Sequence, residues 1–303
     1  MIVGLKVDVC TYDGLRRGVP NLLRLLDRQR VRGTFCVAMG PDTTGRAIVR
    51  ILRPGFLEKL RRTRAIGTYG LRTILSGTLL PPRHMGRDLA HTLREVVAAG
   101  HELAVHGYDH RRWQDGVHRM GEQEVREELA RALAVYGEAT GTRPRGFGAP
   151  GWQVSAASLR VLDEIDLAYS SDTRGGGPFY PLVEGRRLRT LQLPTTFPTL
   201  DETLGLDDPD GEAFVARLCR DTPGQVWGVV TLHAEMEGVG FQSVADHLLA
   251  AYRREGVICL PLVRLADRIR AEAAERIPAA EIVAHPIRGR AGTVAMPATI
   301  GRS

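Results

Sequence analysis

Short apolar runs typical of buried β-strands alternate along this chain with longer segments that have the apolar spacing of helices. Strands that are separated by helices pair in parallel, so the alternation predicts an α/β fold in which helices connect parallel strands. We find no internal repeat. The expected strands cover residues 2–8, 33–39, 101–105, 145–147, 168–170, 192–194, 226–232 and 257–261, and the expected helices cover residues 18–29, 87–99, 122–140, 213–220 and 243–255.

Several of these apolar runs end beside a residue that can bind a metal or transfer a proton. Asp8 ends the first run, and His106, Asp172 and His233 each follow a later one. In folds built from parallel strands, catalytic residues lie where the strands end. We therefore expect these four residues to share one site with His110.

His106 and His110 are four residues apart. Positions i and i+4 of a helix share one face, so a helical turn here would direct both imidazoles at one ion. A histidine pair alone is a weak signal, because paired histidines also occur as solvated or hydrogen-bonded residues. With Asp8 and His233 at other strand ends, the pair predicts a metal-assisted hydrolase.

The composition is that of an ordinary globular protein, with 43% hydrophobic and 25% charged residues. The 4 cysteines have no CxxC spacing, which predicts reduced, mostly structural thiols. Met1 leads directly into an apolar strand-like run, unlike a signal peptide. No apolar run reaches the roughly 18–20 residues that a membrane-spanning helix needs. We therefore expect a cytoplasmic protein that is soluble or peripherally bound to a membrane.

Most of the excess positive charge lies in one segment. The chain has a net charge of +6, and residues 45–83 contain nine basic residues and one acidic residue. Within residues 41–83, apolar pairs alternate with arginines, and a helix would bring the apolar residues broadly to one side. This pattern is typical of a basic amphipathic insert that lies in a lipid interface. The apolar residues concerned are Ile48, Ile51, Leu52, Phe56, Leu57 and Leu60.

The insert predicts contact with an anionic membrane surface, which contributes about 1 kcal/mol per basic residue close to the lipid. The alternative, compatible with the first, is that its helices cap the fold and keep their arginines in water. Nucleic acid is not expected as a partner, because the segment has few aromatic residues and no recognised binding motif. The residues expected at the membrane are Arg50, Arg53, Phe56, Arg61, Arg62 and Arg64.

The residues at the strand ends suit the hydrolysis of an amide. In that chemistry a metal polarises the carbonyl, a carboxylate takes the proton of a water, and a histidine protonates the departing amine. Asp8 suits the base, His233 the acid, and Asp172 a carboxylate that orients the His233 ring. The alternatives are a strand-end turn residue for Asp8 and a turn cap for Asp172.

Longer motifs give the chain a specific resemblance. They lie at residues 7–9, 17–20, 101–110, 171–175, 192–194, 198–202 and 231–238, and the most specific reads His-Ala-Glu-Met-Glu-Gly at residues 233–238. On these motifs the chain resembles the polysaccharide deacetylase (NodB-homology) superfamily, whose fold is a distorted (β/α) barrel. Within it, the chain is most similar to the deformylases of an undecaprenyl-phosphate-linked 4-formamido-4-deoxy-L-arabinose. The basic insert sits where those deformylases carry a similar one.

The resemblance implies a role for each matching catalytic residue. It makes Asp8 the general base and His233 the general acid, and it makes His106 and His110 ligands of a divalent metal. The superfamily pattern has a second aspartate two residues after the base, and this chain has Cys10 there. A thiolate is a competent zinc ligand, so we expect Cys10 to complete a site that favours zinc, with manganese and cobalt as alternatives.

Two other consequences of the cysteine stay open. Asp13 could replace the missing carboxylate, although its offset from the strand differs by three residues. Alternatively, metal binding is weakened and activity is lost. The usual arginine of the superfamily's third motif is also missing, because Gly148 stands in its place.

The resemblance also implies contacts with the substrate. The stretch at residues 149–152, Ala-Pro-Gly-Trp, matches a loop whose backbone N–H helps to bind an oxyanion, at Gly151 or Trp152. The two glutamates of the most specific motif could meet the 4-amino group of the sugar, or lie in a solvated loop. The side chains expected at the substrate are Asp172, Arg174, Glu235 and Glu237.

Together these features predict a metal-dependent amidohydrolase. Residues 1–277 are expected to form the barrel with its insert, and residues 278–303 a flexible tail. The expected reaction removes formyl from the lipid-linked amino sugar, giving formate and the free amine for lipid A modification at the cytoplasmic face of the bacterial inner membrane. The alternatives are an N-deacetylase of another amino sugar and a metal-free, non-catalytic relative in which Cys10 has abolished the site.

Overall fold

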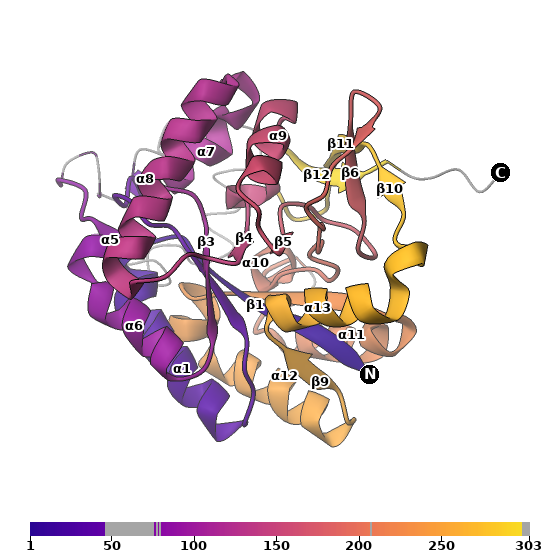
Figure 1. Cartoon of the computed structure of the whole chain (residues 1–303). Helices are drawn as coiled ribbons and strands as arrows, with labels where there is room; N and C mark the ends of the chain where they lie inside the picture. Colours follow the sequence, from indigo (N-terminus) through magenta and orange to yellow (C-terminus); the bar gives the residue numbers. More distant parts are fainter. Residues whose placement is uncertain (46–75, 77, 79, 207, 299–303) are drawn as a thin grey trace.

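The structure of the chain is a computed structural model that describes residues 1–45, 76, 78, 80–206 and 208–298 (Figure 1). Most of the basic insert expected from the sequence is therefore outside the described residues. This applies to every residue expected at the membrane, namely Arg50, Arg53, Phe56, Arg61, Arg62 and Arg64.

A curled sheet of seven parallel strands forms the centre of the molecule (Figure 1). Six strands follow the order β5-β4-β3-β2-β1-β8, and β9 pairs with the first residues of β1. All their carboxyl ends point the same way, which confirms the predicted parallel α/β fold of the (β/α) barrel type. The strands are β1 Ile2–Val9, β2 Thr34–Val37, β3 Glu102–Val105, β4 Gly146–Phe147, β5 Tyr169–Ser170, β8 Gly228–His233 and β9 Ile258–Leu260.

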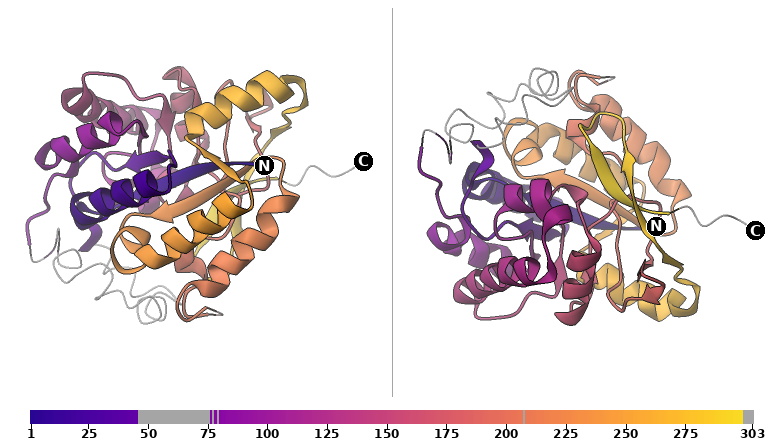
Figure 2. Two further views of the ribbon diagram at one scale, coloured as in Figure 1. Left: turned by 90° about the horizontal axis from the view of Figure 1, so that it is seen from below. Right: turned by 90° about the horizontal axis from the view of Figure 1, so that it is seen from above.

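Helices surround the outside of this sheet. Figures 1 and 2 show α1, α6 and α8 along one side and α11, α12 and α13 along the other. The long helix α8 covers residues Glu122–Thr140, as its sequence predicts, and ends at Gly141, whose φ of +71° suits glycine. The other helices are α1 Val19–Arg28, α5 Met85–Asp88, α6 Ala90–Ala98, α7 His110–Gly116, α9 Ala156–Glu164, α10 Leu200–Thr203, α11 Glu212–Asp221, α12 Gln242–Arg254 and α13 Leu262–Ala273.

The central strand β1 separates apolar from charged side chains. Its odd-numbered residues from Val3 to Val9 belong to the main hydrophobic cluster. Its even-numbered residues point to the opposite face, because side chains alternate along a strand. A side chain at Gly4 would begin 2.5 Å from Leu262 Cδ2, so α13 packs closely there. Beyond Gly4 on the same face lie Lys6 and then Asp8, both buried.

The C-terminal segment, which was expected to be a flexible tail, forms strands over much of residues 279–297. It forms β10 Ala279–Ala280, which pairs with β6 Tyr180–Val183, and a hairpin of β11 Ile282–Pro286 and β12 Thr293–Pro297. The small residue Ala295 is buried, and its carbonyl accepts a hydrogen bond from Arg174 N at 2.8 Å. Small residues let the hairpin approach the barrel closely, and Figure 2 shows it crossing the molecule in the view from above.

Within the part of the chain that the structure describes, no helix has both the length and the apolar character that crossing a bilayer requires.

Candidate metal and proton-transfer site

Cys10, His106 and His110 come together although they belong to different elements. Cys10 follows β1, His106 follows β3, and His110 is the first residue of α7. One potential ligand atom from each residue lies within 4.8 Å of the other two. Cys10 Sγ is 3.7 Å from His106 Nε2, and the two imidazole centroids are 5.0 Å apart. This group is the candidate metal centre.

The spacing of the two histidines predicted that they share one helical turn. The structure places only His110 in a helix. Asp109 caps α7 through a hydrogen bond that its Oδ1 accepts from Arg112 N at 2.9 Å, so the helix begins only at His110. Gly107, with φ of +75°, turns the chain between the end of β3 and this cap. The rings meet because of this turn and cap.

The surroundings of His106 fit a metal ligand. Its Nδ1 lies 2.7 Å from the carbonyl oxygen of Gly148, which can only accept, so Nδ1 carries the proton and Nε2 keeps its lone pair. Burial lowers the pKa of His106 to about 4, which keeps the ring neutral. Burial, together with the carboxylates of Glu235 and Asp8, raises the pKa of the Cys10 thiol. A thiolate in this position therefore requires a nearby cation.

Asp13 is not part of this group. Its Oδ1 pairs with Arg16 Nη2 at 3.0 Å on the outside of the molecule. Cysteine sulfur and imidazole nitrogen are both established zinc ligands, so the donor set of Cys10, His106 and His110 fits a divalent cation without Asp13.

Asp8 lies beside this group at the carboxyl end of β1, where it is a direct neighbour of His233 across the β1–β8 pairing. Its Oδ2 is 3.2 Å from Lys6 Nζ, and both side chains are buried. Burial opposes ionisation of Asp8, but Lys6, His106 and His233 outweigh it and lower the pKa of the carboxyl. Lys6 was not predicted from the sequence, although a lysine inside an apolar strand is a signal that could have found it.

The carboxylate near Nδ1 of His233 is that of Asp201, whereas the sequence predicted Asp172 in this role. His233 Nδ1 and Asp201 Oδ1 are 3.9 Å apart, and Thr199 Oγ1 donates to the same carboxylate oxygen at 2.6 Å. Asp172 is engaged elsewhere, since Gln192 Nε2 donates to its Oδ2 at 2.8 Å. Burial raises the pKa of Asp172 to about 6.

Glu235 and Glu237 are buried, so the solvated-loop alternative is wrong for both. Glu235 Oε1 accepts hydrogen bonds from the backbone N–H groups of Cys10 and Thr11 at 2.6 and 2.7 Å. Glu237 Oε2 accepts one from His233 N at 2.9 Å, and burial raises the pKa of Glu237 to about 7. Glu235 therefore positions the loop that carries the thiol, and Glu237 positions the end of β8 that carries His233.

The Ala-Pro-Gly-Trp loop is strained next to this site. Gly151 and Trp152 both have positive φ, +64° and +54°, which is unusual for a tryptophan. The Trp152 indole is buried, donates from Nε1 to Thr195 Oγ1 at 3.0 Å, and lies 6.2 Å from the His233 ring between centroids. The backbone N–H of Trp152 donates to Ala149 O at 3.1 Å, so Gly151 is the better candidate for an oxyanion donor.

Two guanidinium groups lie over the Trp152 ring. Arg174 is 5.0 Å from its centroid and is committed to the protein, with donors to Thr195 O and Phe197 O and an ion pair to Glu202. Arg290, from the loop between β11 and β12, is 4.5 Å from the same centroid. Its contacts are longer, 3.4 Å to Gly151 O and 3.7 Å to a Glu202 oxygen. Arg290 was not predicted as a site residue, because it lies in residues 278–303, which were expected to be flexible.

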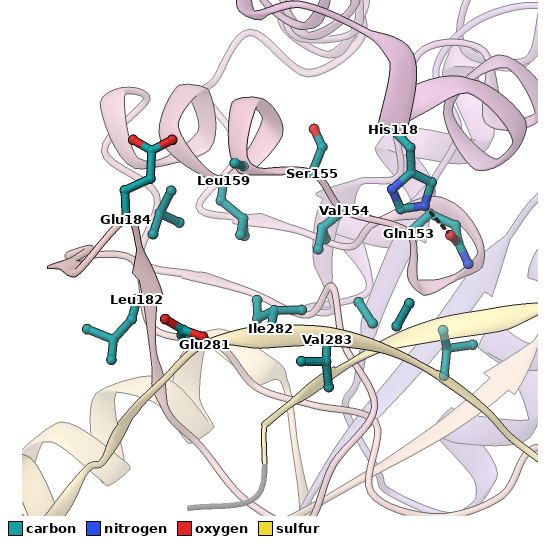
Figure 3. A pocket seen from close by; sticks show the side chains of 15 residues that line it. His118, Gln153, Val154, Ser155, Leu159, Leu182, Glu184, Glu281, Ile282 and Val283 are labelled. Carbon is teal, nitrogen blue, oxygen red and sulfur yellow. Dashed lines mark hydrogen bonds between the residues drawn. The ribbon is translucent and has the colours of Figure 1, made fainter.

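A groove of about 330 Å³ lies between α9, β6 and the β11–β12 hairpin (Figure 3). Its lining is largely apolar, with Leu159, Leu182 and Ile282 among the side chains that Figure 3 labels. Gln153 lines it and follows Trp152 in the chain, but no member of the candidate metal or proton-transfer group does. The groove is therefore distinct from the site at the end of the sheet.

Comparisons with known proteins show which family and which proteins the chain is similar to. A family model described as polysaccharide deacetylase matches residues 3–170. The chain is 33% identical over 265 residues to the probable 4-deoxy-4-formamido-L-arabinose-phosphoundecaprenol deformylase ArnD of Shewanella sediminis (strain HAW-EB3), covering 88% of this chain and 86% of that protein. It is 28% identical over 285 residues to the protein of the same name from Wigglesworthia glossinidia brevipalpis, covering 93% and 97%. The crystal structure of a putative polysaccharide deacetylase from Mycobacterium smegmatis has a TM-score of 0.61 at 19% identity and covers 94% of each chain.

Proposed function

The chain belongs to the polysaccharide deacetylase family, and from this we propose that it is a metal-dependent deformylase. Its proposed substrate is 4-formamido-4-deoxy-L-arabinose linked to undecaprenyl phosphate, and its products are formate and the free amino sugar used in lipid A modification. The observation that carries the proposal is the convergence of Cys10, His106 and His110 beside Asp8 and His233. Relatives named as deformylases of this substrate match nearly the whole chain.

Cys10, His106 and His110 would hold a divalent cation, with zinc favoured by the sulfur ligand and manganese or cobalt as alternatives. When bound, such a cation supplies a Lewis acid that polarises the formyl oxygen and makes water more acidic. Glu235 holds the loop of Cys10, and Gly148 fixes the tautomer of His106.

The protein's own residues then move two protons. Asp8, held as a carboxylate by its charged neighbours, accepts a proton from water while the water oxygen forms a bond to the formyl carbon. The N–H of Gly151 stabilises the negative charge that develops on the formyl oxygen. His233, whose Nδ1 lies 3.9 Å from Asp201 Oδ1, gives a proton to the sugar nitrogen as the C–N bond breaks. Formate and an amine result.

The substrate carries a phosphate on C1, across the sugar ring from the formamide on C4. Arg290 could bind this phosphate, because it lies beside the site and its side-chain contacts with the described residues are long, 3.4 Å to Gly151 O and 3.7 Å to a Glu202 oxygen. The basic insert would bring the protein to an anionic membrane surface at the cytoplasmic face of the inner membrane.

A turnover assay tests this function. Purified, metal-loaded protein is incubated with formyl-bearing and acetyl-bearing forms of the lipid-linked amino sugar, with and without a chelator, and the released formate or acetate is measured. We expect formate release that the chelator abolishes and the added metal restores. Activity on acetylated chito-oligosaccharides with none on the formamido sugar would replace this function with N-deacetylation.

A further inference from the structure

Lys6 is a buried cation in an unusual place. It lies inside β1 with 0% of its surface exposed, two residues before Asp8 on the same face of the strand. Its Nζ is 3.2 Å from Asp8 Oδ2, and among the described residues no acid other than Asp8 lies within ion-pair distance of it. The ring centroid of Trp152 is 5.3 Å from Nζ.

Stability alone is a poor reason for this arrangement. Taking an ammonium and a carboxylate out of water costs several kcal/mol per ion, and their attraction often only offsets that cost. An apolar residue of similar volume in place of Lys6 would avoid the cost. A buried pair of this kind, next to a candidate metal centre, points to a function for the lysine.

Lys6 distinguishes the two oxygens of the Asp8 carboxylate. Oδ2 faces the ammonium, whereas Oδ1 is buried and accepts no hydrogen bond from any described residue. The imidazoles of His106 and His233 are the other groups that favour the Asp8 carboxylate, and the ion pair with Asp8 comes from Lys6. One oxygen is therefore held, and the other is left available for a reacting group.

The loop across the site offers no substitute for Lys6. Position 148 is a glycine, and a side chain there would begin 3.3 Å from Cys36 Sγ and 3.7 Å from His106 Nδ1. Position 148 therefore supplies no charge to Asp8, and Lys6 on β1 pairs with it instead.

We propose that Lys6 is a positioning residue that holds Oδ2 of Asp8 and so presents Oδ1 to the attacking water. This rests on the proposed function. In that reaction Oδ1 accepts one proton from the water whose oxygen bonds to the formyl carbon, and Lys6 itself neither gains nor loses a proton.

The test compares Lys6→Met, which keeps the length and removes the charge, with Lys6→Arg, which keeps a charge. Each full-length, metal-loaded protein is assayed for kcat, KM and bound metal. We expect Lys6→Met to lower kcat by about a hundredfold with KM and metal content nearly unchanged. Lys6→Arg, which keeps the charge, should retain most of the wild-type kcat. Arg16→Met, which removes the exposed ion pair with Asp13, is the control and should retain full activity.

A double-variant cycle covers the case in which Lys6→Met folds poorly. Asp8→Asn leaves the Lys6 charge buried without a partner, so adding Lys6→Met to Asp8→Asn should raise the free energy of unfolding. A folded, metal-loaded Lys6→Met with normal kcat, or a double variant no more stable than Asp8→Asn, overturns the proposal. If the wild-type protein releases no formate, the deformylase function fails, and the stability cycle still tests the coupling between Lys6 and Asp8.

Discussion

His106 donates its Nδ1–H to the carbonyl oxygen of Gly148 over 2.7 Å, and this bond leaves Nε2 facing Cys10 Sγ at 3.7 Å. This bond requires the chain after β4 to approach the His106 ring closely. A side chain at position 148 would meet Cys36 Sγ at 3.3 Å. The glycine at position 148 therefore lets the chain after β4 come close to the His106 ring.

Replacing the thiol tests the metal centre directly. Cys10→Ala removes one of three ligand atoms, so we expect the affinity for zinc to fall at least about tenfold. Cys10→Asp replaces sulfur with a hard oxygen and should shift the preference from zinc toward manganese or cobalt. Titration calorimetry and metal analysis of the purified proteins measure both effects.

Cys259→Ala is the matched control, because Cys259 is a free cysteine on β9 outside the ligand group. It should bind zinc as the wild-type protein does. Equal zinc affinity in Cys10→Ala and the wild-type protein would show that the sulfur is not a ligand.

Substitutions of Asp201 and Asp172 should have different effects on kcat, because only Asp201 lies near the proposed general acid His233. Asp201→Asn removes the charge 3.9 Å from His233 Nδ1, so kcat should fall about tenfold or more while KM stays nearly constant. Asp172→Asn keeps a hydrogen-bonding side chain beside Gln192 and should reduce kcat much less. Steady-state kinetics of the two folded variants show which aspartate supports His233. The reverse order of effects would restore Asp172 as the orienting group.

The positions of Asp8, His106 and His233 could be predicted from sequence because parallel strands bring their carboxyl ends to one edge. Each follows or ends an apolar run, and the register pairs Asp8 with His233 directly. Local geometry was less predictable. The spacing of His106 and His110 suggested a helical face, but the positive φ of Gly107 divides the pair between a strand end and a helix start.

Contacts between distant segments could not be inferred from local patterns. Asp201 reaches His233 across 32 positions of the chain, and no periodicity connects them. Arg290 reaches Trp152 because the C-terminal hairpin packs against the barrel, with Val294 and Ala295 buried. The same segment, residues 278–303, contains many small residues, Gly and Pro, and was expected to be flexible. A composition rich in Gly and Pro reports backbone freedom, and it does not show whether a neighbouring surface restricts that freedom.

Arg290 is predicted to recognise the phosphate of the substrate. Losing one charge-assisted hydrogen bond costs about 1.5–3 kcal/mol, so Arg290→Gln should raise KM for the lipid-linked substrate by at least about tenfold. A formamido sugar without phosphate should show no such change. Arg288→Gln, an exposed neighbour in the same loop, is the control. An equal effect of Arg290→Gln on both substrates would indicate a structural role beside Trp152.

The basic insert is predicted to bind anionic lipid. Replacing Arg61, Arg62 and Arg64 with Ser removes about 3 kcal/mol of attraction and should strongly reduce flotation with vesicles that contain anionic lipid. The control replaces the exposed Arg220, Arg253 and Arg254 with Ser, which removes the same charge from α11 and α12. Equal flotation of the insert variant and the wild-type protein would favour a capping role alone.

His101 should make stability depend on pH far from the candidate site. Its Nδ1 accepts a hydrogen bond from Gly33 N at 3.2 Å, and its ring packs edge-on against Phe35. Burial, reinforced by Arg32, lowers the pKa of His101 to about 4, below the ordinary value of 6.5. The unfolded chain therefore takes up a proton first as the pH falls, and stability declines between about pH 6.5 and pH 4.

His101→Gln removes this titration but keeps an acceptor for Gly33, so it should lose less stability on acidification than the wild-type protein. We expect a difference of about 2 kcal/mol in the change of unfolding free energy between pH 7.5 and pH 4.5, measured by urea denaturation. The exposed His91→Gln is the control and should follow the wild-type curve. If the unfolding free energy of His101→Gln depends on pH as that of the wild-type protein does, then protonation of His101 is not the cause of the loss of stability at low pH.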